Sequence, residues 1–203
     1  MNLKHSFARF AKLELSRWQP GQTDYVPTGL KGALQVYDRF VSDRDFGQKK
    51  RIFLVPGEFN QPYDNSVFKI AGVPSQFILE GMNFDADASG VYGSEVVFRE
   101  ARFQFKLYKR QGVARASGVG VTSSALVEQI TTWGDFSRYS ASESAEFDNS
   151  DYTIGTLYLA HGTPVDRDTI LEDQNGQQYA VREISSFLEL RLLRVQAIEK
   201  EGL

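Results

Sequence analysis

Short runs of β-forming residues, each ended by a turn residue, constrain the fold of this chain more than any other feature. Leu13 and Leu15 alternate with polar residues before Gln19-Pro20-Gly21, and Gly, Pro, Asn or Asp bounds the later runs ALQVYDRFV, RIFLV, SVFKI and QFILE. Alternation with a period of two is typical of strands that bury one face, and the bounding residues favour turns. The pattern predicts a mainly β protein, an antiparallel β-barrel or sandwich with long loops.

The clearest pattern lies in the C-terminal third. The runs YTIGTLYLA, DTILED, QQYAVREIS and LELRLLRVQAIE follow one another, and Asn175-Gly176 separates the second from the third. Asn-Gly between two alternating runs predicts a β-hairpin with a type I′ turn, because both central residues of that turn need positive φ. Thr169 and Leu171 are then expected opposite Tyr179 and Val181.

Two segments have helical rather than strand periodicity. One extends from Asn2 to Phe10 and the other from Ser123 to Trp133; their apolar residues are Leu3, Phe7 and Phe10 in the first and Leu126, Ile130 and Trp133 in the second. Apolar residues three and four positions apart predict an amphipathic helix. We therefore expect a short N-terminal helix and one further short helix.

The middle of the chain is expected to elaborate one barrel. Ser94 to Arg110 is the longest strand candidate, and its apolar phase changes across Arg99-Glu100-Ala101, which indicates a bulge or a bend. The polar ranges 85–93 and 134–151 are expected to be exposed loops. A chain of 203 residues can hold two domains but does not require them, and we find no internal repeat. We expect a single β-barrel-type domain over 1–203 with an insertion or elaborated loop region at about 46–151.

Composition argues against several classes of function. The chain has no Cys, which removes disulfides, thiolate metal sites and Cys nucleophiles and suits a reducing cytosol. No apolar run approaches the ~20 residues that cross a bilayer, so neither a signal peptide nor a membrane span is expected. A net charge of -3 at pH 7 argues against wrapping nucleic acid with a broad basic face, because such binding needs Lys and Arg to neutralise phosphates.

The best candidate for a binding site is DADASG. It matches the first half of a calcium loop, with oxygen ligands at Asp85, Asp87 and Ser89 and a glycine, Gly90, for the sharp turn. The second half departs from the motif, because Val96 stands where a Glu is needed. Short Asp, Ser and Gly runs also form ordinary turns through side-chain hydrogen bonds, and this is the interpretation that the residues favour. Calcium at Asp85, Asp87 and Ser89 is the metal hypothesis that the sequence leaves open.

No residue set predicts an enzyme or a cofactor. The carboxylate pairs Asp166/Asp168 and Glu172/Asp173 would suit a glycosidase only if they flanked a cleft, and their context favours the solvated edge of a hairpin. The two His residues, His5 and His161, lie far apart and outside any HExxH pattern. A basic cluster could contact phosphates or simply end a strand in solvent; it comprises Lys106, Lys109, Arg110 and Arg115.

The last fifty residues resemble the C-terminal part of phage head-tail connector proteins, the stopper or head-closure family. That family shows an apolar strand, a polar turn, the pattern "gD.I...dG..Y.V..v" and a final strand rich in Leu, Arg and Val. The segments that match are TLYLAHGTPVDRDTILEDQNGQQYAVREI and LELRLLRVQAIE, with Asp168, Ile170, Asn175-Gly176, Tyr179 and Val181 at the patterned positions. KLELSRWQPGQTDYVPTG resembles the family's opening strand and turn. The resemblance covers about a third of the chain, and simple stoppers are shorter.

The resemblance implies a virion structural protein that is not an enzyme and has no cofactor. It implies a β-barrel subunit that is made in the host cytoplasm and assembles in the virion neck as a homo-oligomeric ring, with a hexamer favoured. The ring would contact portal or adaptor and tail proteins, and double-stranded DNA would pass through its lumen without sequence-specific binding. The ranges 85–93 and 134–151 would line or plug that lumen.

Two other functions remain open from the residues alone. One is a β-sandwich binding module, with calcium-dependent carbohydrate binding at Asp85, Asp87 and Ser89. The other is a hydrolase that uses one of the acidic pairs.

Overall fold

The computed structural model describes residues 11–37, 50–87, 90–114, 121–138 and 153–198. All regular secondary structure within these ranges is β-strand. The strands are β1 (Leu13–Trp18), β2 (Val26–Tyr37), β3 (Lys50–Pro56), β4 (Val67–Ile70), β5 (Gln76–Asp87), β6 (Gly90–Ala101), β7 (Phe103–Ala114), β8 (Val121–Arg138), β9 (Thr153–Ala160), β10 (Thr169–Asp173), β11 (Gln178–Phe187) and β12 (Leu190–Ile198). The described ranges contain no helix with the length and apolarity of a membrane span.

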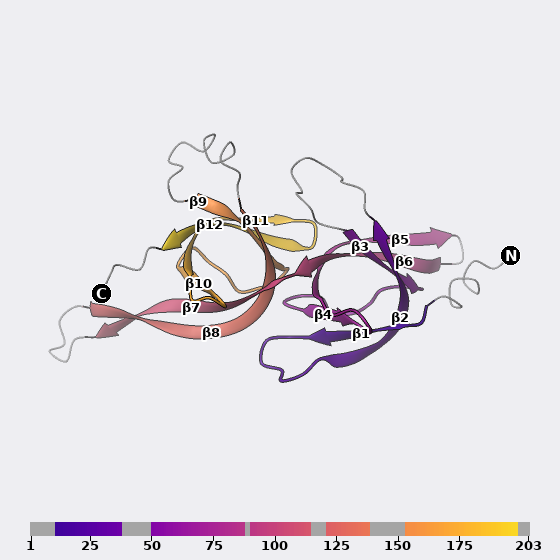
Figure 1. The fold of residues 1–203 in the computed structure, drawn as a ribbon, viewed down its shortest axis with the longest axis horizontal. Helices are drawn as coiled ribbons and strands as arrows, with labels where there is room; N and C mark the ends of the chain where they lie inside the picture. Colours follow the sequence, from indigo (N-terminus) through magenta and orange to yellow (C-terminus); the bar gives the residue numbers. More distant parts are fainter. Residues whose placement is uncertain (1–10, 38–49, 88–89, 115–120, 139–152, 199–203) are drawn as a thin grey trace.

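The strands close into two antiparallel barrels that lie side by side (Figure 1). Around the first barrel the order is β1-β2-β3-β6-β5-β4, and around the second it is β10-β11-β12-β9-β8-β7. The prediction of a mainly β, antiparallel protein is confirmed. We expected one barrel with an insertion at about 46–151; in the structure this range supplies β3 to β6 of the first barrel and β7 and β8 of the second.

The two barrels have the same topology. If the strands of each barrel are numbered from its own start, both follow the order 1-2-3-6-5-4 around the circle. The registers agree as well: Leu13, the first residue of β1, pairs with Gly32 of β2, and Phe103, the first residue of β7, pairs with Gly134 of β8. The chain therefore contains a structural repeat, although its sequence shows none.

Atoms of the next strand in the barrel lie close to the backbone of both paired glycines, Gly32 and Gly134. A Cβ on Gly32 would lie 2.5 Å from the Phe53 ring, and one on Gly134 would lie 2.6 Å from the backbone oxygen of Tyr158. No other residue fits these places without moving a neighbour. In each barrel the second strand changes partner here, because β2 pairs with β3 from Ala33 onwards and β8 pairs with β9 from Gly134 onwards.

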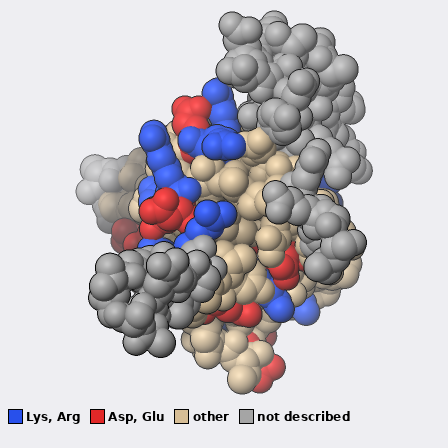
Figure 2. Space-filling model, turned by 90° about the vertical axis from the view of Figure 1, so that its left-hand side faces the viewer, with Lys and Arg blue, Asp and Glu red and all other residues tan. Residues whose placement is uncertain are grey.

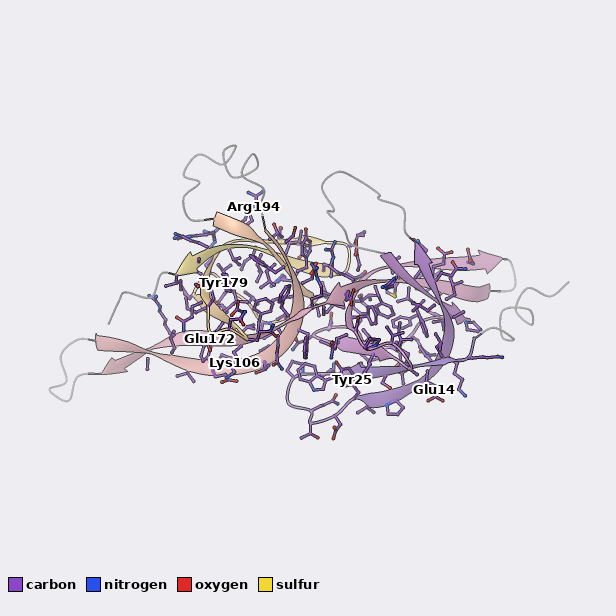
Figure 3. All side chains as sticks on the ribbon, in the orientation of Figure 1. Glu14, Tyr25, Lys106, Glu172, Tyr179 and Arg194 are labelled. Carbon is purple, nitrogen blue, oxygen red and sulfur yellow. The ribbon has the colours of Figure 1, made fainter. Side chains whose placement is uncertain are left out.

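Each barrel has its own core. The first is dominated by aromatic rings, in which Phe98 contacts Phe53, Phe68 and Phe77 at centroid distances of 6.3, 5.4 and 5.8 Å. The second is largely aliphatic, with Tyr179 and Phe105 among Leu and Val side chains. Figure 3 shows side chains filling the interior of both barrels. Small barrels fill in this way, so the interior of each is a packed core rather than a channel.

The predicted helix from Ser123 to Trp133 is wrong, because this segment lies within strand β8 and pairs with β7. Leu107 pairs with Ile130 and Tyr108 with Glu128, which leaves Gln129 as an extra, bulged residue. A bulge changes which face the following residues present. Apolar residues on two different faces therefore occur at a helix-like spacing. The helix predicted for 2–10 lies outside the described residues.

The expected long strand from Ser94 to Arg110 is two strands in two barrels. β6 ends at Ala101, β7 begins at Phe103, and Arg102 lies between them. The phase change at Arg99-Glu100-Ala101 thus marks the passage from one barrel to the next. The expected loop at 85–93 is mostly the β5 and β6 hairpin, and 134–138 continues β8; the remainder, 139–151, lies outside the described residues.

The predicted C-terminal hairpin is confirmed in its pairing and corrected in its turn. Leu171 pairs with Tyr179, as expected. Only Gly176 of the Asn-Gly pair has positive φ, at 76°, so the turn is not of type I′. The reason lies in Asp173, whose backbone oxygen accepts a bond from the Gly176 N–H and whose carboxylate accepts one from the Asn175 N–H.

Candidate functional site

The two barrels meet in an apolar junction built from residues that face outward from their own barrels. Val67 and Ile78 adjoin the core residues Phe68 and Phe77, so they point away from the first core, yet both are 0% exposed. Their cluster also contains Ala101 of the first barrel and, from the second, Ala160 and Leu190, with Trp18, Trp133, Tyr158 and Leu192 at its border. Each barrel thus covers an apolar face of the other.

A buried ion network crosses the same junction. Asp135 of the second barrel is 0% exposed and accepts a 3.0 Å bond from Arg99 of the first. Arg102, in the link between the barrels, donates two further bonds to Asp135, at 2.9 and 2.7 Å. Glu80 lies 3.4 Å from Arg99, whose guanidinium also covers the Tyr158 ring at 3.9 Å from its centroid. Such directional contacts set the orientation of one barrel against the other.

A second contact joins the loops that precede β4 and β10. The Asn65 N–H donates to the backbone oxygen of His161 at 2.5 Å, and His161 Nδ1 lies 2.6 Å from an Asp64 carboxylate oxygen. The Thr163 hydroxyl donates to the Asn65 side chain. Besides the buried ion network, the barrels are therefore joined by this loop contact and by a 3.1 Å bond from the Glu189 N–H to the backbone oxygen of Glu80.

Two hairpins extend beyond the barrels and form arms. The β5 and β6 arm points to the right in Figure 1 and the β7 and β8 arm points to the left. Along the outer part of each arm the two strands pair with one another, as far as Asp87 with Gly90 and Ala114 with Val121. Phe84 on the first arm is 47% exposed and Leu126 on the second is 40% exposed. One exposed apolar side chain on each arm is ordinary for a protein surface and does not form a patch.

The residues of the calcium hypothesis lie at the tip of the first arm. Asp85 and Asp87 end strand β5, Asp85 is exposed, and Gly90 begins β6 with a φ of 113°. Ser89 lies outside the described residues. Within the described part of the chain, no three His, Cys, Asp or Glu residues gather closely enough to hold a metal ion. The hypothesis stays untested, and the described geometry is that of a hairpin end.

The acidic pairs shape the turns on either side of β10. Asp166 accepts bonds from the Thr169 hydroxyl at 2.8 Å and the Asp168 N–H at 3.1 Å, and Lys109 lies 2.6 Å away. The hydrogen bond from Lys109, aided by that from Thr169, lowers the pKa of Asp166. After β10, the Tyr179 hydroxyl donates to Asp173 at 2.9 Å. These carboxylates have partners that explain their positions structurally.

Two basic residues of β7, Lys106 and Lys109, have acidic neighbours. On the face that Figure 2 shows, Lys and Arg side chains lie beside Asp and Glu side chains. Lys109 pairs with Asp166, and Lys106 lies opposite Glu172 in the β7 and β10 ladder. Arg115 lies outside the described residues. Mixed charge of this kind offers no broad surface for phosphates.

Sequence reasoning missed the junction because its residues form no motif. Arg99 and Asp135 are separated by 36 positions and Asn65 and Thr163 by 98. The only local signal was the phase change at Arg99-Glu100-Ala101. Comparison with known proteins supplies no other signal, since the chain matches no family model, no curated protein and no solved structure.

Proposed function

We propose that this chain is a structural protein of a tailed-phage virion neck, a non-enzymatic head-tail connector of the stopper type. Its copies form a ring that joins portal to tail and surrounds the DNA. One observation carries the proposal. The C-terminal residues that resemble the connector family, Thr156 to Glu199, contain strands β10 to β12 and most of β9, which are consecutive strands of one closed barrel. The N-terminal match, Lys12 to Gly29, lies on β1 and the start of β2 in the other barrel. The C-terminal part of the resemblance thus falls on a coherent part of the fold.

Packing decides where DNA would pass in such a ring. Neither barrel has an open interior, so the channel must lie between copies of the chain rather than through a barrel. A net charge of -3 gives the chain little attraction for phosphates. DNA can slide past a surface that does not neutralise its phosphates, because no counterions are released on contact.

The two arms suit contacts with neighbouring rings or subunits. They project from opposite ends of the molecule (Figure 1), and each carries a large exposed apolar residue, Phe84 or Leu126. Aromatic residues such as Phe84 are enriched in interfaces that a partner buries. Portal, adaptor and tail proteins are the partners that the proposal assigns to them.

The first test is to sequence the DNA on either side of the gene. Portal, capsid and tail genes are expected there, and particles that lack this protein should then package DNA but fail to retain it or to join tails. Metabolic or secretion genes as neighbours would refute the proposal. Heat released on calorimetric titration with calcium would in that case favour the binding module at Asp85, Asp87 and Ser89.

A further inference from the structure

The repeat gives each position in one barrel an equivalent in the other. In the first barrel a row of four outward-facing residues crosses β1, β4, β5 and β6 and meets the second barrel: Trp18, Val67, Ile78 and Arg99. The same ladder positions in β7, β10, β11 and β12 hold Tyr108, Ile170, Ala180 and Gln196. Both rows read aromatic, aliphatic, aliphatic, polar.

The likeness of the two rows includes a side-chain contact. Glu80 lies beside Arg99 in the first barrel, and Arg182 donates from its Nε to the side chain of Gln196 in the second. The positions are the same, but the first contact joins two charged side chains and the second joins an arginine to a neutral amide. Such agreement is not expected of surfaces that merely face solvent, where side chains vary freely.

The two rows differ in what covers them. Val67 and Ile78 are 0% exposed because the second barrel lies against them. Ile170 is 5% exposed, whereas Tyr108, Ala180 and Gln196 are only partly buried, and among the described residues no barrel lies beside their row. β10 and the outer part of β7 lie on the left of the second barrel in Figure 1, away from the first barrel, while β7 begins at the junction.

The surface that covers the first row also has an equivalent. The second barrel meets the first through the paired residues Asp135, Tyr158 and Leu192. The same ladder positions on β2, β3 and β6 of the first barrel hold Ala33, Leu54 and Glu95. Strand β2, which carries Ala33, lies on the right of the first barrel in Figure 1, away from the second barrel. Leu54 alternates on β3 with the core residues Phe53 and Val55, so it faces outward, and it is 8% exposed.

We propose that a second copy of the chain docks its Ala33, Leu54 and Glu95 row on the row of Tyr108, Ile170, Ala180 and Gln196. This brings together between chains the ladder positions that already meet within one chain, but without the ion pair, because Gln196 and Ala33 occupy the positions of Arg99 and Asp135. Arg182 borders one row and Glu95 belongs to the other, so these two side chains offer opposite charges across the contact. The inference deepens the proposed function, because it rests on the ring and names the surfaces that close it. Distinct surfaces at opposite ends make a head-to-tail contact, which is the kind that closes into rings.

Charge reversal tests the contact. Sedimentation velocity over a wide range of concentrations should show the wild-type chain forming species at multiples of 22.9 kDa. Arg182→Glu and Glu95→Arg should each weaken this association about tenfold or more, because like charges then face one another across the contact. The double variant should restore it. Urea unfolding of each variant checks that the chain still folds, and Ala180→Glu provides a second disruption of the same surface.

The outcomes separate this inference from the proposed function. A chain that stays monomeric at every concentration overturns the inference, as does an oligomer that both reversals and Ala180→Glu leave unchanged. In the second case a ring survives but is closed by other surfaces. The neck assignment is decided independently by the genes that flank this one. Recovery in the double variant alone supports the proposed contact.

Discussion

Replacement of Asp135 by Ala tests whether the ion network joins the barrels. The carboxylate is 0% exposed and accepts one bond from Arg99 and two from Arg102. The Arg102 side chain is 48% exposed, so water replaces its lost partner at little cost. The Arg99 side chain is only 6% exposed and would keep Glu80 at 3.4 Å and the Tyr158 ring. Most of the loss therefore comes from a buried guanidinium left short of negative charge.

The expected magnitude follows from that distinction. Removal of one partner of a buried ion pair costs about 3 to 5 kcal/mol. We expect the lower end of this range, since Glu80 still lies beside Arg99. In a chain of this size such a loss lowers Tm by roughly 6 to 20 °C. Arg102→Ala should cost less, because Arg99 still neutralises Asp135 and the lost side chain is half exposed.

Urea unfolding followed by circular dichroism measures these free energies. The matched control is Glu14→Ala, which breaks the surface pair with Lys31, whose side chains are 62% and 60% exposed. That pair should contribute under about 1 kcal/mol. If Asp135→Ala costs no more than Glu14→Ala, the network does not hold the junction and the reasoning fails.

Three further changes test the packing and the titrating groups. Gly134→Ala should lower the free energy of unfolding, measured with urea, by about 1 to 3 kcal/mol, because the added Cβ would lie 2.6 Å from a backbone oxygen. Gly81→Ala is the control and should be nearly neutral, since its Cβ would lie 3.5 Å from the nearest atom. Equal effects would contradict the crowding argument. Burial raises the pKa of Tyr25 to about 12. The free energy of unfolding should therefore fall as the pH rises from 10 toward 12, because the unfolded chain releases the tyrosine proton first. Tyr25→Phe should remove this pH dependence, and an unchanged dependence would contradict the assignment to Tyr25. The pKa of Asp166 is lowered, mainly by the hydrogen bond from Lys109. Asp166→Asn should therefore lower the free energy of unfolding by up to about 1 kcal/mol at neutral pH, and by nothing in acid that protonates the wild-type carboxylate in both the folded and the unfolded chain. A difference that persists in acid would point to packing instead.

Local sequence patterns predicted the strands correctly where apolar and polar residues alternate regularly. The alternation of Leu13 and Leu15 corresponds to β1, and Leu171 and Tyr179 pair as the hairpin pattern indicated. The helix predicted at Ser123 to Trp133 failed because Gln129 is bulged, and a bulge depends on the partner strand rather than on the segment itself. The turn at Asn175-Gly176 lies where it was predicted, but it is not of type I′, because the Asp173 carboxylate accepts a hydrogen bond from the Asn175 N–H.

The candidate site was predictable only in part. Asp166 and Asp173 have the structural roles that their context favoured, while the tests of Asp85, Asp87 and Ser89 as calcium ligands remain to be made. The junction could not be found, because its charged residues meet through folding and not through sequence spacing.

The sequence by itself determined the fold class, the position of most strands and the mixed surface charge, since all three depend on the identity and the local order of residues. Only the tertiary structure decided that the strands close into two barrels of one topology. Closure depends on pairs such as β1 with β4 and β7 with β10, which are formed between distant segments. The apolar side chains of Val67 and Ile78 are expected to be buried, but their identity does not predict which part of the chain covers them. In this protein the cover is the second barrel, because an apolar face outside a closed barrel is buried only by another body.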